Sequence, residues 1–192
     1  DADARGWLQL RLRPYRVEAL DGATEGLATG YFEPLVEAQR QPRGAFRVPL
    51  HALPDDLASR KPWWTRQQIE TLPAAQAALR GRELAYVADP LDAAFLQIQG
   101  SGRVELPDGS VMRVGYADQN GHPFRSIGRV LIERGELTRD TASMQSIRAW
   151  ARRNPDKLEA LLDENPSYVF FREVPPPERG TIDATIDGPY GS

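Results

Sequence analysis

Apolar residues alternate with polar ones in short runs along this chain of 192 residues, which favours strands over long helices. The central part predicts three strands: a largely buried one over residues 95–99 and two shorter ones over 104–106 and 111–116. Pro-Asp-Gly-Ser at 107–110 has the residue types of a hairpin turn, and Asn120-Gly121 predicts a second tight turn. Further strands are expected over 27–32, 45–50, 84–87 and 168–171.

Helical signals form a smaller set. Thr65 and Gln68 have the spacing of a capping box, which predicts a helix through residue 72, and a second helical patch covers 74–79. Ser126 is expected to cap a helix over 127–134 that Gly135 ends. Apolar residues recur at helical spacing from residue 143 onward, and Asn154 followed by proline predicts the start of one more helix. The expected fold class is therefore mainly β with a small helical cluster.

Composition narrows the possible functions. The chain has 24 basic and 27 acidic residues, so its net charge of −3 gives no reason to expect a nucleic-acid partner. Cysteine is absent, which excludes disulfides and thiolate metal sites within these residues. His51 and His122 stand far apart with no carboxylate at ligand spacing, so we expect neither a metal site nor a cofactor. No apolar run approaches the roughly 20 residues of a membrane span. Because no leader precedes Asp1, we expect any targeting segment to have been removed.

The segment Gln99-Gly100-Ser101-Gly102 is the first candidate for ligand binding. It lacks the lysine of a phosphate loop, but amide, hydroxyl and backbone groups gather there, which suits a neutral ligand with many hydroxyls, such as a carbohydrate. The two glycines allow close approach of a ligand to the backbone. The alternative is that they only serve a bulge between two strands.

Other candidates are aromatic and acidic residues. Tyr31, Phe32 and Glu33 stand at a strand end before a proline and form either a binding wall or a core aromatic pair with a solvated carboxylate. Asp108 and Asp118 are carboxyl candidates by position, although Asp108 is more simply a turn residue and Asp118 more simply solvated. The tryptophans at 63–64 suit either a sugar platform or, more simply, packing of a loop against the core.

Several blocks together resemble the membrane-bound lytic murein transglycosylase A family. They cover most of the chain in order: Gly-Tyr-Phe-Glu-Pro at 30–34, Leu-Ala-Tyr-Val at 84–87, Phe-Leu-Gln-Ile-Gln-Gly-Ser-Gly at 95–102, Gly-Tyr at 115–116, Asn-Gly-His at 120–122, Arg-Ser-Ile-Gly at 125–128, Ser-Met-Gln-Ser-Ile at 143–147 and Asn-Pro-Ser-Tyr-Val-Phe-Phe at 165–171.

The resemblance implies an activity and a place in the cell. Such enzymes cleave the MurNAc–GlcNAc β-1,4 bond of peptidoglycan without water and leave a 1,6-anhydro product, with one aspartate as acid and then base. They are periplasmic lipoproteins on the inner face of the outer membrane, so the implied partners are glycan strands, and the membrane is reached only through a lipid anchor. The implied fold is a double-psi β-barrel domain with a smaller inserted β-barrel domain, and the glycan lies between the two.

The family's aspartate-rich C-terminal module is expected beyond residue 188, whereas the sequence ends at Ser192. We therefore expect residues 1–31 to be a piece of the double-psi barrel domain, 32–171 the barrel-like groove domain and 172–192 a linker, with no catalytic residue among them. On this interpretation Gln99, Gly100, Ser101 and Gly102 line the groove, Tyr31, Phe32 and Glu33 form its adjacent wall, and Asn120 and Gly121 lie at its rim. The alternative is a non-catalytic glycan-binding or structural module.

Overall fold

The structure is a computed structural model that describes residues 6–7, 10–11 and 33–175. The chain divides into two units, Asp1–Tyr31 and Phe32–Ser192. In the first unit, the guanidinium of Arg11 lies 4.5 Å from the centroid of the Trp7 ring. The strand expected over 27–32, the candidates Tyr31 and Phe32, and most of the expected linker lie outside the described residues. All that follows concerns the second unit.

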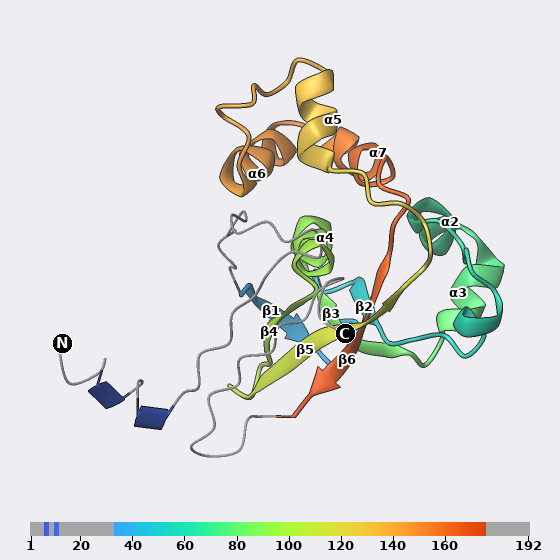
Figure 1. Cartoon of the computed structure of the whole chain (residues 1–192). Coiled ribbons are helices and arrows are strands. Elements are labelled where there is room, and N and C mark those ends of the chain that lie inside the picture. Colours follow the sequence, from blue (N-terminus) through green and yellow to red (C-terminus); the bar gives the residue numbers. More distant parts are fainter. Residues whose placement is uncertain (1–5, 8–9, 12–32, 176–192) are drawn as a thin grey trace, which may run out of the picture. The chain divides into compact units, whose positions relative to one another are not determined.

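Six strands of the second unit form one mixed sheet (Figure 1). In chain order they are β1 (Leu35–Gln39), β2 (Val48–His51), β3 (Glu83–Val87), β4 (Ser101–Glu105), β5 (Val111–Gln119) and β6 (Val169–Val174). Their order in the sheet is β2-β3-β1-β4-β5-β6, and of these neighbours only β1 and β4 are parallel. The expectation of a mainly β fold with some helices is consistent with this sheet and with the helices around it.

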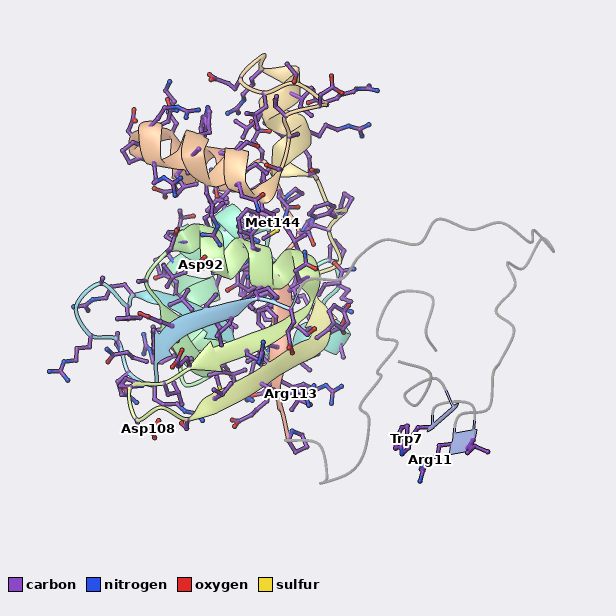
Figure 2. All side chains as sticks on the ribbon, turned by 90° about the vertical axis from the view of Figure 1, so that its left-hand side faces the viewer. Trp7, Arg11, Asp92, Asp108, Arg113 and Met144 are labelled. Carbon is purple, nitrogen blue, oxygen red and sulfur yellow. The ribbon has the colours of Figure 1, made fainter. Side chains whose placement is uncertain are left out.

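The helices fall into two groups around α4, which packs on the sheet (Figure 1). They are η1 (Leu57–Ser59), α2 (Arg66–Thr71), α3 (Pro73–Leu79), α4 (Pro90–Gln99), α5 (Ile127–Glu133), α6 (Met144–Arg153), η2 (Pro155–Lys157) and α7 (Leu158–Leu162). Helices α5, α6 and α7 lie on the side of α4 away from the sheet. We call these three helices the helical group. Arg148 on α6 joins the helical group to α4 through an ion pair with Asp92, with 2.6 Å between Nη2 and Oδ1. Figure 2 labels Asp92 on α4, which lies below the helical group in this view.

The prediction of a buried strand over 95–99 is wrong, because these residues form the last half of α4. The Asp89 side chain caps this helix by accepting a hydrogen bond from Leu91 N at 2.8 Å, and Pro90 occupies its first turn. Helix α4 is buried on two sides: Ala93 and Leu96 belong to the core of the sheet, and Leu91, Ala94 and Phe95 to that of the helical group. Burial on two sides gives a nearly continuous apolar run, which has the same pattern as a buried strand.

Most of the other local predictions are confirmed. Thr65 and Gln68 form the reciprocal capping box of α2, and Ser126 caps α5. The residues at 107–110 connect β4 to β5, and the Asp108 carboxylate accepts a hydrogen bond from Ser110 N at 2.9 Å. The predicted helix start at Asn154 is confirmed, because Asn154 is the N-cap residue of η2 and Pro155 lies in its first turn. The Asn154 side chain does not cap η2, since its amide donates backward to Trp150 O at 3.0 Å at the end of α6.

The buried apolar residues form three clusters. One lies between the sheet and α4, and includes Val87, Leu96, Val104 and Phe171. The second lies inside the helical group and against the other side of α4, around the fully buried Trp150. The third packs the loop before α2 and both α2 and α3 against Tyr168 and Phe170. Helix α4 contributes to the first two clusters and therefore joins the sheet to the helical group.

The sheet curls so that its two outer strands approach each other. His51, the last residue of β2, shares a 2.8 Å hydrogen bond with the hydroxyl of Tyr168, which directly precedes β6. The register of β5 against β6 shifts between Tyr116 and Asp118, a bulge that bends the strand. Outer strand β2 contains Pro49, which has no N–H to donate and is tolerated in such an edge position.

A buried polar network supports the curled sheet. The Arg66 guanidinium donates to Gln97 Oε1 and, at 3.3 Å, to Ser167 O, while Gln97 hydrogen-bonds the Tyr168 hydroxyl. Burial raises the pKa of Tyr168, so its phenol stays protonated at neutral pH. Burial also lowers the pKa of His51 to about 4, although the charge of Glu83 opposes this shift. His51 is consequently neutral in the folded protein at pH 7.

We predict that His51 makes folding stability depend on pH. Below pH 6.5 the unfolded chain takes up a proton on this residue that the folded chain accepts only near pH 4. Stability therefore falls as the pH drops from 6.5 towards 4, by about 2 kcal/mol at pH 5 and about 3 kcal/mol in total. Urea unfolding at pH 7.5, 6 and 5 measures this loss, and it should be much smaller in His51→Gln.

A His122→Gln variant isolates the contribution of the second histidine in the same measurement. Other titrating groups are common to the three proteins, so the comparison uses differences between proteins at each pH. If His51→Gln loses as much stability as the parent between pH 7.5 and 5, the assignment to His51 is wrong.

Candidate functional site

The candidate segment Gln99–Gly102 spans the end of α4 and the start of β4. Gly100 ends the helix with a φ of +78°, and its N–H donates to Leu96 O at 2.8 Å. Gln99, Gly100 and Ser101 are all half-buried. The first glycine therefore lets the chain reverse from helix to strand, which places Gln99 and Ser101 on either side of the turn.

Position 102 requires a glycine for a different reason, which is lack of space for a side chain. A Cβ at this position would collide with the Leu96 side chain and lie 3.0 Å from Pro34 O. Gly102 is buried, and the close approach that it permits is between β4 and the protein's own α4 and Pro34. The bulge weighed in the sequence analysis is absent here, since β4 pairs with β5 in unbroken register.

Tyr116 on β5 lies beside this turn and was missed as a candidate from the sequence. Its side chain is 41% exposed, and its Cβ would be 3.8 Å from a Cβ placed on Gly100. Its hydroxyl hydrogen-bonds the Asp118 carboxylate. The available signal was the bulky aromatic directly after Gly115 near a strand end, where apolar alternation alone predicts a core residue.

Asp118 is held as a carboxylate. Lys61 Nζ lies 2.6 Å and 2.7 Å from its two oxygens. Partial burial alone would raise the pKa of Asp118, but hydrogen bonds from Lys61 and from Gln119 N, with the lysine charge, hold it below its ordinary value. A carboxyl group of this kind is suited to positioning neighbouring groups and not to donating a proton at neutral pH.

The remaining carboxyl candidates are also engaged. Glu33 Oε2 lies 3.0 Å from Arg103 Nε, which ties the segment that leads into β1 to β4. Asp108 accepts bonds from Ser110 at the hairpin, and hydrogen bonding by that serine is the main reason for its lowered pKa. Figure 2 shows Asp108 at the tip of this hairpin. The interpretation of Asp108 as a turn residue is confirmed.

Asn120 is fully buried and binds several segments together. Its Nδ2 donates to Trp64 O and Pro166 O, each at 2.8 Å, while its Oδ1 accepts from Tyr168 N at 3.0 Å. Both hydrogens of the buried Asn120 amide are used in these bonds, so the side chain has no donor left for a ligand. Gly121 next to it is exposed, with a φ of +88°, and a Cβ there would lie 3.1 Å from Pro62 Cα.

The tryptophans at 63–64 follow the simpler interpretation. Trp63 is 3% exposed and packs edge-on against Phe170, with ring centroids 5.6 Å apart. Trp64 is half-buried beneath Arg60, whose guanidinium lies 4.1 Å from the ring centroid. Neither ring is an open stacking platform.

The structure thus brings three candidates into one patch, Gln99, Gly100 and Ser101 at the turn, and places Tyr116 beside them. We call this patch the candidate surface. The Tyr116–Asp118–Lys61 chain of contacts extends it towards Gly121. Among residues 33–175, no three potential metal-binding side chains of His, Cys, Asp or Glu type lie together. The candidate surface presents an aromatic ring together with amide and hydroxyl groups, a combination that suits an uncharged polar ligand.

Comparison with known families identifies the class to which this fold and surface belong. Residues 27–172 match the model of the MltA specific insert domain, so the chain is a member of that family. The relatives are lytic enzymes of the murein wall. The chain is 35% identical over 172 residues to membrane-bound lytic murein transglycosylase A of Escherichia coli strain K12, covering 88% of the chain and 45% of that protein. It is 38% identical over 150 residues to the Vibrio cholerae protein of the same name, covering 76% and 39%.

Solved structures agree with this assignment. Lytic transglycosylase LtgG of Burkholderia pseudomallei superposes with a TM-score of 0.70 at 48% identity, covering 82% of this chain and 46% of that one. Escherichia coli MltA with bound chitohexaose superposes with a TM-score of 0.67 at 36% identity, covering 76% and 42%. The chain therefore spans less than half the length of these relatives. Among the described residues, no helix combines the length and apolar character needed to cross a bilayer.

We predict that substitutions of Gly100 act first on the backbone. Because its φ is +78°, Gly100→Val should cost about 2 kcal/mol of unfolding free energy, and Gly100→Asn about 1 kcal/mol, since asparagine tolerates this conformation better. Urea unfolding gives both values. Gly109→Val, at a φ of +79° in the hairpin, is the matched control and should cost about as much as Gly100→Val. Full stability of Gly100→Val would contradict this explanation.

Proposed function

We propose that this chain is the glycan-binding part of a lytic murein transglycosylase, and that the candidate surface holds the sugar strand. The observation that carries the proposal is the likeness to Escherichia coli MltA, a protein whose structure contains bound chitohexaose. The proposed reaction cleaves the MurNAc–GlcNAc β-1,4 bond by attack of the muramyl 6-hydroxyl on C1, which gives a 1,6-anhydro product. The proposed setting is the periplasm, with a lipid anchor on the full-length protein.

The candidate surface has the groups that a sugar strand needs. The half-exposed ring of Tyr116 can stack on the C–H face of a pyranose, and its hydrogen bond to Asp118 fixes the ring in place. Gln99 offers two donors and one acceptor next to it. Each such hydrogen bond contributes only about 0.5–1.5 kcal/mol, so several sugars must be held at once. In this proposal Glu33 and Gly121 lie at the margins of the strand.

The acid and base of the reaction come from outside the described residues in this proposal. Asp118 is held ionised by Lys61, and Glu33 is paired with Arg103. Glu70 has a raised pKa, caused first by burial, but it lies 3.6 Å from Arg66 and acts as the counter-ion of that buried guanidinium. A further module of the full-length protein would therefore supply the catalytic aspartate, and the chain would contribute binding and orientation.

We predict that chitohexaose binds the chain through the candidate surface. Tyr116→Ala should weaken binding about tenfold, or about 1.4 kcal/mol, through loss of stacking. Gln99→Ala and Ser101→Ala should each weaken it about threefold. Isothermal titration calorimetry measures the affinities, and thermal melting checks folding. Tyr86→Ala on β3 is the matched control and should leave the affinity unchanged. Equal affinity of the folded Tyr116→Ala and Gln99→Ala variants would refute the site.

We further predict that the chain by itself releases no 1,6-anhydromuropeptides from purified peptidoglycan. Chromatography of the soluble products measures this, with a full-length relative as the positive control. Turnover by the chain would mean that one of its own carboxylates is catalytic, and Asp118→Asn and Glu33→Gln would then identify it. Glycan binding without turnover in a natural protein of this length would instead favour the second candidate function, a non-catalytic glycan-binding module.

A further inference from the structure

A hollow of about 620 Å³ lies within the helical group, between the start of α5, the start of α6 and the segment that joins them. Its apolar wall is formed by Ile132, Met144 and Ile147, and its polar rim by Arg129 and Arg139. Figure 2 labels Met144 between the helical group and α4, with Asp108 below them at the tip of the hairpin. The volume falls within the range of about 300–1,000 Å³ that is usual for sites of small organic ligands.

The charge of the hollow is positive. Glu133 lines it as well, but Arg125 Nη2 lies 3.3 Å from the Glu133 carboxylate and neutralises it. Arg134 in turn pairs with Glu164 at 2.6 Å. Arg129 and Arg139 are exposed, and within the described part of the chain neither makes an ion pair or hydrogen bond through its guanidinium. Two arginines thus border the hollow, and within the described residues neither is paired with a carboxylate.

The hollow is lined by residues from two sequence blocks that contribute nothing to the candidate surface. Ser126 and Gly128 come from the block at 125–128, while Ser143, Met144 and Ile147 come from the block at 143–147. The candidate surface is instead built from the end of α4 and from β4 and β5. Its exposed charges, Asp118 and Lys61, pair with each other. The two places therefore offer different chemistry, neutral and aromatic in one case, cationic and apolar in the other.

We propose that this hollow binds the acidic peptide stem that peptidoglycan strands carry, an inference that rests on the proposed function. A guanidinium donates two parallel hydrogen bonds to a carboxylate, so two arginines on one rim suit a short peptide with two or more carboxylates. The apolar wall suits the methyl groups of alanine residues in such a peptide. The sugar strand would then be held by the candidate surface and its peptide branch by the helical group.

The test uses the stem tripeptide L-Ala-γ-D-Glu-meso-diaminopimelate, free of sugar, titrated into the chain at low salt and followed by amide chemical shifts. We expect saturable binding, with shifts at residues of α5 and α6, that weakens as salt is added. Arg129→Gln and Arg139→Gln should each weaken binding about fivefold, and Ala142→Glu, which adds a carboxylate to the lining, should abolish it. Arg152→Gln, at the far end of α6, is the matched control and should bind as the parent does.

The proposal would be overturned by absence of saturable binding by the parent, by equal binding of the tripeptide with its carboxylates amidated, or by equal weakening by Arg152→Gln. A linear peptide of L-amino acids with the same number of carboxylates tests the identity of the ligand. Equal affinity for it would mean a general site for acidic proteins and would overturn the assignment to the stem. Chitohexaose titrated in parallel keeps the two proposals separate, because its failure to bind would count against the candidate surface alone.

Discussion

The buried guanidinium of Arg66 is the constraint on which much of this fold depends. The residue is 4% exposed, and a buried charge is tolerated only where partners surround it. Those partners come from three places, Glu70 one turn along α2, Gln97 on α4 and the Ser167 carbonyl just before β6. Because Gln97 also bonds Tyr168, and Tyr168 bonds His51, the same network reaches the last residue of β2. One charge on a six-residue helix therefore fixes α4 against both outer strands of the sheet.

The position of α4 in turn determines what the candidate surface can present. The helix is held by the sheet on one side and by the helical group on the other, so its last turn has little freedom. Gly100 then reverses the chain, and Gly102 lets β4 start directly under Leu96. Side chains at this turn are consequently presented by rigid elements, which limits the entropy lost when a ligand orders them. Asn120 has the corresponding role at the end of β5, where its buried amide ties the loop of Trp64 to the start of β6.

Local chemistry predicted much of the fold. Capping at Thr65 and Ser126 and the hairpin turn at Asp108 depend on neighbours within a few residues, so the sequence alone reveals them. Helix α4 was mistaken for a strand because its burial on both sides removes the helical periodicity, and the cap at Asp89 was the signal that could have corrected this. At the candidate surface, the polar turn was predicted, whereas the roles of Tyr116 and Lys61 depend on contacts across 57 positions or between separate elements.

The curled sheet leaves two outer strands, and each carries its own protection against pairing with another molecule. Pro49 interrupts the row of donors along β2, and β6 ends in the exposed charged residues Arg172 and Glu173. An edge with an interrupted row of backbone donors, or one whose exposed charged side chains a new strand would have to cover, is a poor template for a strand from a neighbouring chain. The sheet should therefore resist intermolecular extension at either edge, even at high protein concentration, and remain a sheet of six strands.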